Sequence, residues 1–163
     1  MGKVFKEWYE ECPDFMDASC LVEDEVTKEA SDSGYISSDV VTEYLNTIKY
    51  FEVLTPTEER EYALRVHSGD PEARKKLIEH NAKLVIHVAK KRSNRSPLEF
   101  ADLIQAGNIG LVQAVDKFDP DKGRFSTFAM YWILASMKRA EENLARPIRL
   151  PSYLVQTKTK INR

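Results

Sequence analysis

The sequence has little of the chemistry that builds metal or disulfide sites, with two cysteines and three histidines among 163 residues. Cys12 and Cys20 form no CxxC pair, and no Cys/His set has zinc-ligand spacing, so a zinc site and a disulfide framework are both excluded. This usage fits a reducing cytoplasm, where we expect the protein to be. No apolar run approaches membrane-spanning length, and residues 1–7 lack a signal-peptide core, so we expect no membrane contact.

Motifs of the common catalytic classes are also missing. The chain holds no Walker loop, no GxSxG and no HExxH. Asp119 and Asp121 faintly resemble a calcium loop, but Arg124 stands where such a loop requires glycine. We therefore expect a protein that is not an enzyme and that uses no cofactor or metal.

Charge is distributed unevenly although the net charge is only −2. Residues 1–43 hold 12 acidic and 3 basic side chains, and residues 44–163 hold 14 acidic and 21 basic ones. A basic body favours a polyanionic partner, and an acidic tail either competes with that partner or serves only to solubilise the chain. We predict that residues 1–38 form an acidic, largely disordered tail.

The rest of the chain has helical periodicity and no strand-like alternation, so we predict an all-α, compact multi-helix bundle. Asp39 is the expected N-cap of a first helix, and Thr55-Pro56-Thr57-Glu58 reads as a capping box for a second helix ending near His67. Four further helices are expected, over residues 71–91, over 98–117, from Ser126 or Thr127 to before Pro147, and from Pro151 onward.

Aromatic and basic side chains alternate over residues 122–132, with Lys138 and Arg139 following. Single-stranded nucleic acid needs both, because unstacked bases bind aromatic faces and phosphates bind cations. The same aromatic spacing also describes an ordinary buried helix face. Ala129, Ile133 and Met137 offer a competing apolar stripe, so we expect some of the aromatic side chains to be exposed.

Two glycines interrupt the amphipathic segment 102–111, and each costs about 1 kcal/mol relative to alanine in a helix. Close helix packing or a protein partner lying against the helix would compensate for them. Asp102, Gln105 and Asn108 share one face at spacings of three residues, which indicates either a polar recognition stripe or a solvated surface.

Several motifs in order resemble the second domain of bacterial primary-type sigma factors. They are DLIQAGNIGL at 102–111, AVDKFDP at 114–120, FSTFA at 125–129 followed by WI at 132–133, and RLP at 149–151. The resemblance runs from about residue 40 to 163 and is greatest to general-stress, stationary-phase sigma factors. It implies a sigma domain 2 over 39–150 and the start of the next sigma domain over 151–163, so we expect a truncated piece lacking the −35-reading domains.

The resemblance also implies partners and site residues. RNA polymerase core would bind through the clamp coiled coil of its β′ subunit, and promoter DNA would bind through the single-stranded non-template strand of the −10 element, with one base flipped into a pocket. An anti-sigma or activator protein is a further possible partner. The implied polymerase contacts are Asp102, Gln105, Asn108, Leu111 and Val112. The implied DNA contacts are Phe118, Asp119, Lys122, Arg124, Phe125, Thr127, Phe128, Tyr131, Trp132, Lys138, Arg139, Arg146, Arg149, Tyr153 and Gln156.

The sequence departs from the family pattern at four places. The family's pair of tryptophans is Tyr131-Trp132 here. The loop before Arg124 is one residue short, and Ala135 and Lys138 replace the usual glutamine and threonine that read the upstream base pair of the −10 element. Alanine cannot hydrogen-bond to a base edge, so we predict a relaxed or altered preference there. Two rival interpretations remain, a degenerate sigma-like regulator that reads DNA poorly and a protein-interaction module whose aromatic residues are core.

Overall fold

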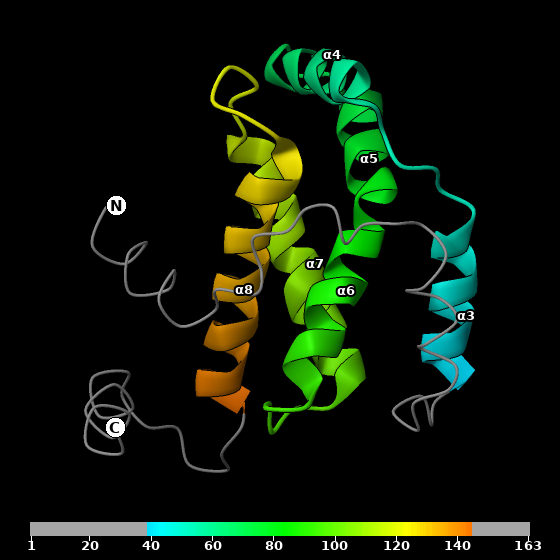
Figure 1. The fold of residues 1–163 in the computed structure, drawn as a ribbon, viewed down its shortest axis with the longest axis vertical. Coiled ribbons are helices and arrows are strands. Elements are labelled where there is room, and N and C mark those ends of the chain that lie inside the picture. Colours follow the sequence, from blue (N-terminus) through cyan, green and yellow to red (C-terminus); the bar gives the residue numbers. More distant parts are fainter. Residues whose placement is uncertain (1–38, 145–163) are drawn as a thin grey trace.

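A computed structural model describes residues 39–144 (Figure 1). Every regular element in this part of the chain is an α-helix, which confirms the all-α prediction. The helices are α3 (Asp39–Lys49), α4 (Pro56–His67), α5 (Pro71–His80), α6 (Ala82–Ser93), α7 (Phe100–Lys117) and α8 (Phe125–Leu144). Outside the described residues lie the expected acidic tail, the helix expected from Pro151 onward, and the site residues Arg146, Arg149, Tyr153 and Gln156.

The starts of α4 and α5 follow their local sequence. Thr55 Oγ1 accepts from the Glu58 backbone N–H at 3.4 Å, and the Thr55 backbone N–H donates to Glu58 Oε2 at 2.8 Å, which confirms the capping box. At α5 the Asp70 carboxylate accepts from the first-turn N–H groups of Glu72 and Ala73. Each helix has proline at its first position, where the missing N–H is not needed.

A single helix over residues 71–91 is the prediction that the structure corrects. The chain forms two helices, α5 and α6, which meet at Asn81 and run on as one column in Figure 1. Asn81 has φ −102° and ψ 5°, and its Nδ2 donates to the Leu77 carbonyl at 2.8 Å. Asparagine side chains compete for backbone groups in this way, and the competition interrupts the helix.

The core lies between α6, α7 and α8. Figure 1 shows α7 and α8 side by side and antiparallel, with α4 lying across the end where residues 118–124 join them. Leu103, Leu111, Ile133 and Met137 are almost fully buried between these helices. The predicted start of α8 at a Ser126 or Thr127 cap is wrong, since the helix already begins at Phe125 and Ser126 is only 8% exposed.

The two glycines of α7 allow a close approach to α8. A Cβ atom on Gly110 would lie 2.5 Å from the Trp132 carbonyl oxygen and 2.8 Å from Ile133 Cα. A Cβ atom on Gly107 would lie 2.5 Å from Met137 Cε and 2.6 Å from Val85 Cγ1. Close helix packing is therefore sufficient to explain why this amphipathic segment carries glycine.

Candidate polymerase and nucleic-acid interfaces

The outward face of α7 carries most of the predicted polymerase contacts. Asp102 and Gln105 are exposed, and Asn108 and Val112 are half-buried. Ile109, which the sequence analysis did not include, is 57% exposed on the same helix and adds an apolar side chain to this surface. The available signal in the sequence was its spacing, because Ile109 follows Gln105 by four residues and Asp102 by seven and so shares their helix face.

Leu111 does not belong to this face. Its side chain is 1% exposed and packs in the core, so it lies away from the exposed face of α7, and its predicted polymerase contact stays a prediction. The physical reason is the helical period, because Leu111 follows Leu103 and Ile104 by two turns and falls on their buried stripe.

Asn108 is held by a side chain from α3. The Asn108 Nδ2 donates to Tyr44 Oη at 2.9 Å, and the same hydroxyl lies 3.2 Å from Asn108 Oδ1. Burial raises the pKa of the Tyr44 hydroxyl, and the Asn108 bond lowers it by a smaller amount. No local pattern predicts this pairing, since the two residues are 64 positions apart.

Five aromatic rings form a continuous row at the α7–α8 connection. Phe118 meets Phe125 edge-on at 5.1 Å between ring centroids and lies 5.8 Å from Phe128, which lies 6.2 Å from Trp132. Tyr131 meets Trp132 edge-on at 6.1 Å. Such tilted and edge-on pairs are favourable geometries for aromatic side chains.

This row runs from the core to the surface, and only its outer part is open to a ligand. Phe118 is 4% exposed and Phe125 is fully buried, whereas Phe128, Tyr131 and Trp132 are half-buried. Phe118 and Phe125 fill the space that α7 and α8 enclose and offer no open ring face in this structure, so their predicted contacts with DNA stay a prediction. The expectation that some aromatic residues remain accessible holds for the outer three.

Two features of Trp132 are unusual for a half-buried tryptophan, a cation over its ring and an indole N–H without a hydrogen-bond partner. Lys117 Nζ lies 4.2 Å from the centre of its ring, in cation–π geometry. Its Nε1 is the one buried side-chain polar atom without a hydrogen-bond partner among the described residues. A buried donor left without a partner costs about 1–3 kcal/mol, and native proteins retain few of them.

The predicted DNA contacts in the 118–124 loop are engaged in pairs. Lys122 Nζ lies 2.8 Å from Asp119 Oδ2, and this hydrogen bond is the main cause that lowers the pKa of the Asp119 carboxyl and raises that of Lys122. Asp121 pairs with Arg60 of α4 at 2.6 Å. Both pairs are exposed, so each contributes little to stability.

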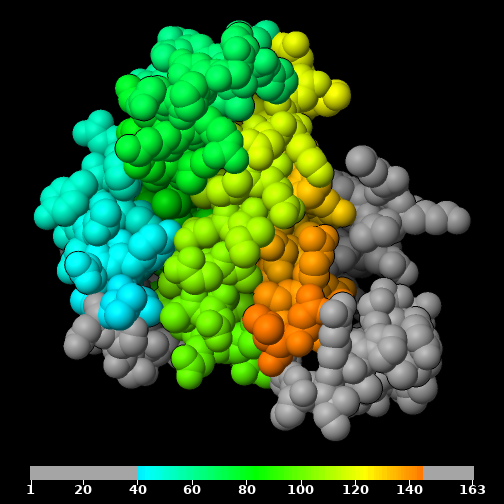
Figure 2. Space-filling view, turned by 180° about the vertical axis from the view of Figure 1, so that it is seen from behind, coloured from blue at the N-terminus to red at the C-terminus, as the bar shows by residue number. Residues whose placement is uncertain are grey.

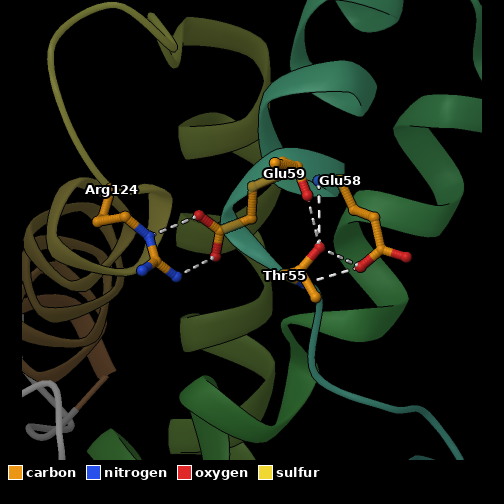
Figure 3. A network of polar contacts seen from close by, with 5 residues as sticks. Thr55, Glu58, Glu59 and Arg124 are labelled. Carbon is orange, nitrogen blue, oxygen red and sulfur yellow. Dashed lines mark hydrogen bonds and ion pairs between the residues drawn. The ribbon is translucent and has the colours of Figure 1, made fainter.

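Arg124 is bound more firmly than a surface cation. Its Nε and Nη2 donate to the two carboxylate oxygens of Glu59 at 3.0 and 3.1 Å, as Figure 3 shows. The Glu59 side chain is only 8% exposed, and the bond to it raises the pKa of Arg124. His67 Nε2 lies 2.8 Å from the Phe118 carbonyl oxygen, so α4 holds both ends of the loop. Sequence reasoning missed Glu59, because nothing local marks it as buried.

The remaining predicted DNA contacts within the described residues lie on α8. Thr127 and Arg139 are exposed, and Lys138 is half-buried, as is Ala135. Ala135, Lys138 and Arg139 follow the aromatic row along α8, whereas Thr127 lies between Phe125 and Phe128. No described helix combines the length and the apolar character needed to cross a bilayer.

Two sequence families match the segments that build these surfaces. Sigma-70 factor, region 1.2, matches residues 39–72, which form α3, α4 and the start of α5. Sigma-70 region 2 matches residues 77–146, which include α6, α7 and α8. The polar face of α7 and the aromatic row therefore lie in region 2, and Tyr44 and Glu59 lie in region 1.2.

Named relatives agree with these matches. The chain is 46% identical over 121 residues to RNA polymerase sigma factor RpoS of Coxiella burnetii, covering 74% of this chain and 34% of that protein. It is 46% identical over 131 residues to RNA polymerase sigma factor SigA of Clostridium acetobutylicum, covering 80% of this chain and 34% of that one. The chain thus spans about a third of the length of the curated relatives it matches. With both regions present in order and at this identity, the chain belongs to the sigma-70 family.

Proposed function

We propose that the protein acts in transcription initiation by binding RNA polymerase core through the outward face of α7. The observation that carries the proposal is this face itself. Asp102 and Gln105 are exposed beside the apolar Ile109, in a helix whose opposite side fills the core. Polar groups around an exposed aliphatic side chain suit a specific protein partner. The partner surface is the clamp coiled coil of the β′ subunit, and no nucleotide hydrolysis is needed.

We further propose that the outer aromatic residues capture the melted non-template strand of the −10 element. Phe128, Tyr131 and Trp132 offer half-exposed rings, and the cationic Lys138 and Arg139 follow about two turns farther along α8. Each stacked base contributes about 1–3 kcal/mol, which offsets the cost of unpairing it. The Trp132 indole, whose N–H has no partner, would gain a hydrogen bond by rearranging toward DNA.

Co-purification with RNA polymerase core tests the first proposal. The variant Asp102→Ala/Gln105→Ala/Asn108→Ala is expected to lose binding, because it removes the polar groups and leaves the buried stripe of α7 unchanged. Glu61→Ala/Glu72→Ala is the matched control on the exposed faces of α4 and α5 and should bind as wild type. A folded wild-type chain that fails to bind core would overturn the proposal.

Tryptophan fluorescence tests DNA capture. The chain has two tryptophans, so the experiment uses Trp8→Phe, in which Trp132 is the only tryptophan, with excitation chosen to avoid tyrosine. Emission should quench on adding a single-stranded −10 oligonucleotide and change far less with a scrambled one of equal length. Equal responses to both would remove the sequence-selective part of the proposal. Variants of the upstream base pair then test the preference predicted from Ala135 and Lys138.

A second candidate is a sigma-like regulator that binds polymerase but reads DNA poorly. One observation favours it, since Arg124 and Lys122, two of the predicted DNA contacts, are engaged with carboxylates of this chain. Core binding without quenching by −10 DNA would select this candidate. If the chain binds neither partner, the protein-interaction module is the better interpretation.

A further inference from the structure

The α3 helix reaches the proposed polymerase surface through Tyr44. The Tyr44 hydroxyl lies 2.9 Å from Asn108 Nδ2 and 3.2 Å from Asn108 Oδ1. Figure 2, which views the molecule from behind, shows the cyan surface of α3 directly beside the yellow-green surface that includes α7. The two helices come from different matched regions of the sequence. A side chain of region 1.2 therefore touches a predicted polymerase contact of region 2.

The hydroxyl is itself fixed in place. Val41 and Ile48 bury the inner side of α3 in the core at 7% and 5% exposure, and the Tyr44 ring packs against the same cluster. A hydroxyl can both donate and accept, so either orientation of the Asn108 amide keeps a hydrogen bond to it. An asparagine on a helix surface would otherwise rotate about its side-chain bonds, and here that rotation is restricted.

We propose that Tyr44 is a positioning residue of the polymerase-binding surface, holding the Asn108 amide ready for its partner. The proposal rests on the proposed function. An amide has two donor hydrogens and two acceptor lone pairs, so binding Tyr44 leaves capacity for a second partner. Because the rotation of Asn108 is already restricted before association, binding loses less side-chain entropy, and this advantage is worth about three- to tenfold in affinity.

The test measures the affinity of the full chain for purified RNA polymerase core. Tyr44→Phe keeps the ring and removes the hydroxyl, and it should weaken binding about three- to tenfold. Tyr50→Phe is the matched control, because Tyr50 is 85% exposed in the segment after α3. The control should bind as wild type, and wild-type affinity in Tyr44→Phe would overturn the proposal.

A double-mutant cycle separates positioning from a general structural effect. If Tyr44 acts through Asn108, Tyr44→Phe should cause no further loss of affinity in an Asn108→Ala background. An equal loss in both backgrounds would show that Tyr44 acts by another route and would also overturn the proposal. The side-chain amide NMR signals of Asn108 give an independent readout and should shift and broaden in Tyr44→Phe.

Asp102→Ala distinguishes the failure of this proposal from failure of the proposed function. If Asp102→Ala weakens binding and Tyr44→Phe does not, only the positioning role falls. If Asp102→Ala, Gln105→Ala and Asn108→Ala all bind core as wild type, the proposed interface is wrong and the role of Tyr44 falls with it.

Discussion

The two candidate surfaces differ in how their side chains relate to the core. On α7, Asp102 and Gln105 stand outside the hydrophobic interior, and the buried stripe of the same helix is made by other residues. At the start of α8, the aromatic row begins in the interior at Phe125 and ends half-exposed at Trp132. A polar surface can thus be altered without touching the fold, whereas the aromatic surface is an extension of the fold.

Phe125→Ala should lower the free energy of unfolding more than any other substitution proposed for these two surfaces. Removing a fully buried phenylalanine from a core costs about 3–5 kcal/mol in the free energy of unfolding, through lost burial and the cavity left behind. Asp102→Ala on α7 should change it by less than about 0.5 kcal/mol. Urea unfolding monitored by circular dichroism measures both. Equal losses would break the distinction between the two surfaces.

Gly110→Ala should be the next most damaging change. Its new methyl group would meet the Trp132 carbonyl and Ile133 Cα, which are backbone atoms and cannot turn aside. Overpacking of this kind costs about 1–3 kcal/mol, and it outweighs the roughly 1 kcal/mol gained in helix propensity.

Gly107→Ala is the matched comparison within the same helix. The methyl group there would meet the flexible end of Met137 and a methyl of Val85, so part of the clash can be relieved by side-chain movement. We expect Gly107→Ala to lower the unfolding midpoint less than Gly110→Ala does. The reverse order would mean that side chains rather than backbone limit the α7–α8 approach.

Glu59→Gln should loosen the 118–124 loop, which leads into the aromatic residues of α8. The substitution keeps the shape but replaces one charged acceptor facing Arg124 by an amide donor, at a cost of about 1 kcal/mol given the half-exposed guanidinium. Asp121→Asn breaks the exposed pair with Arg60 and should cost less than about 0.5 kcal/mol. Thermal unfolding of both variants checks the order, and a larger effect of Asp121→Asn would contradict it.

The smallest expected effect is a pH dependence at α6. Burial, helped by the charges of Lys91 and Lys90, lowers the pKa of His87 below its ordinary 6.5. The unfolded chain then binds the proton more readily, so His87 favours folding fully above about pH 6.5 and loses this contribution as pH falls below it. His87→Gln should flatten the fall in unfolding free energy between pH 7 and pH 5, and an unchanged slope would assign it to other groups.

Local signals in the sequence predicted the local features of the fold well. Thr55 and Glu58 lie three residues apart and build their cap without outside help, and Asp70 before Pro71 does the same. The break at Asn81 was missed, because apolar periodicity continues through it and only the asparagine side chain competes with the helix. The predicted start of α8 was one or two residues too late. Serine and threonine are common N-caps, so Ser126 and Thr127 favoured a start after Phe125, where the helix in fact begins.

The two candidate surfaces depend on tertiary contacts that local sequence patterns do not predict. Asp102 and Gln105 were predicted to be on one face from their spacing, and both are exposed. Spacing alone does not decide whether Phe125 is buried or exposed, since aromatic residues at that interval suit either a core or a stacking surface. Glu59 pairs across 65 positions with Arg124, so its burial follows from tertiary packing alone.

The close contact at Gly110 has a mechanical consequence. Where α7 meets α8, main chain would touch main chain, with the Trp132 carbonyl and Ile133 Cα in the place that a Cβ would take. At this point backbone atoms set how closely the two helices approach, and they cannot yield by rotating as a side chain can. Under the proposed function, a polymerase held on one helix and a DNA strand held on the other are kept at a fixed spacing and angle, set by the backbone itself.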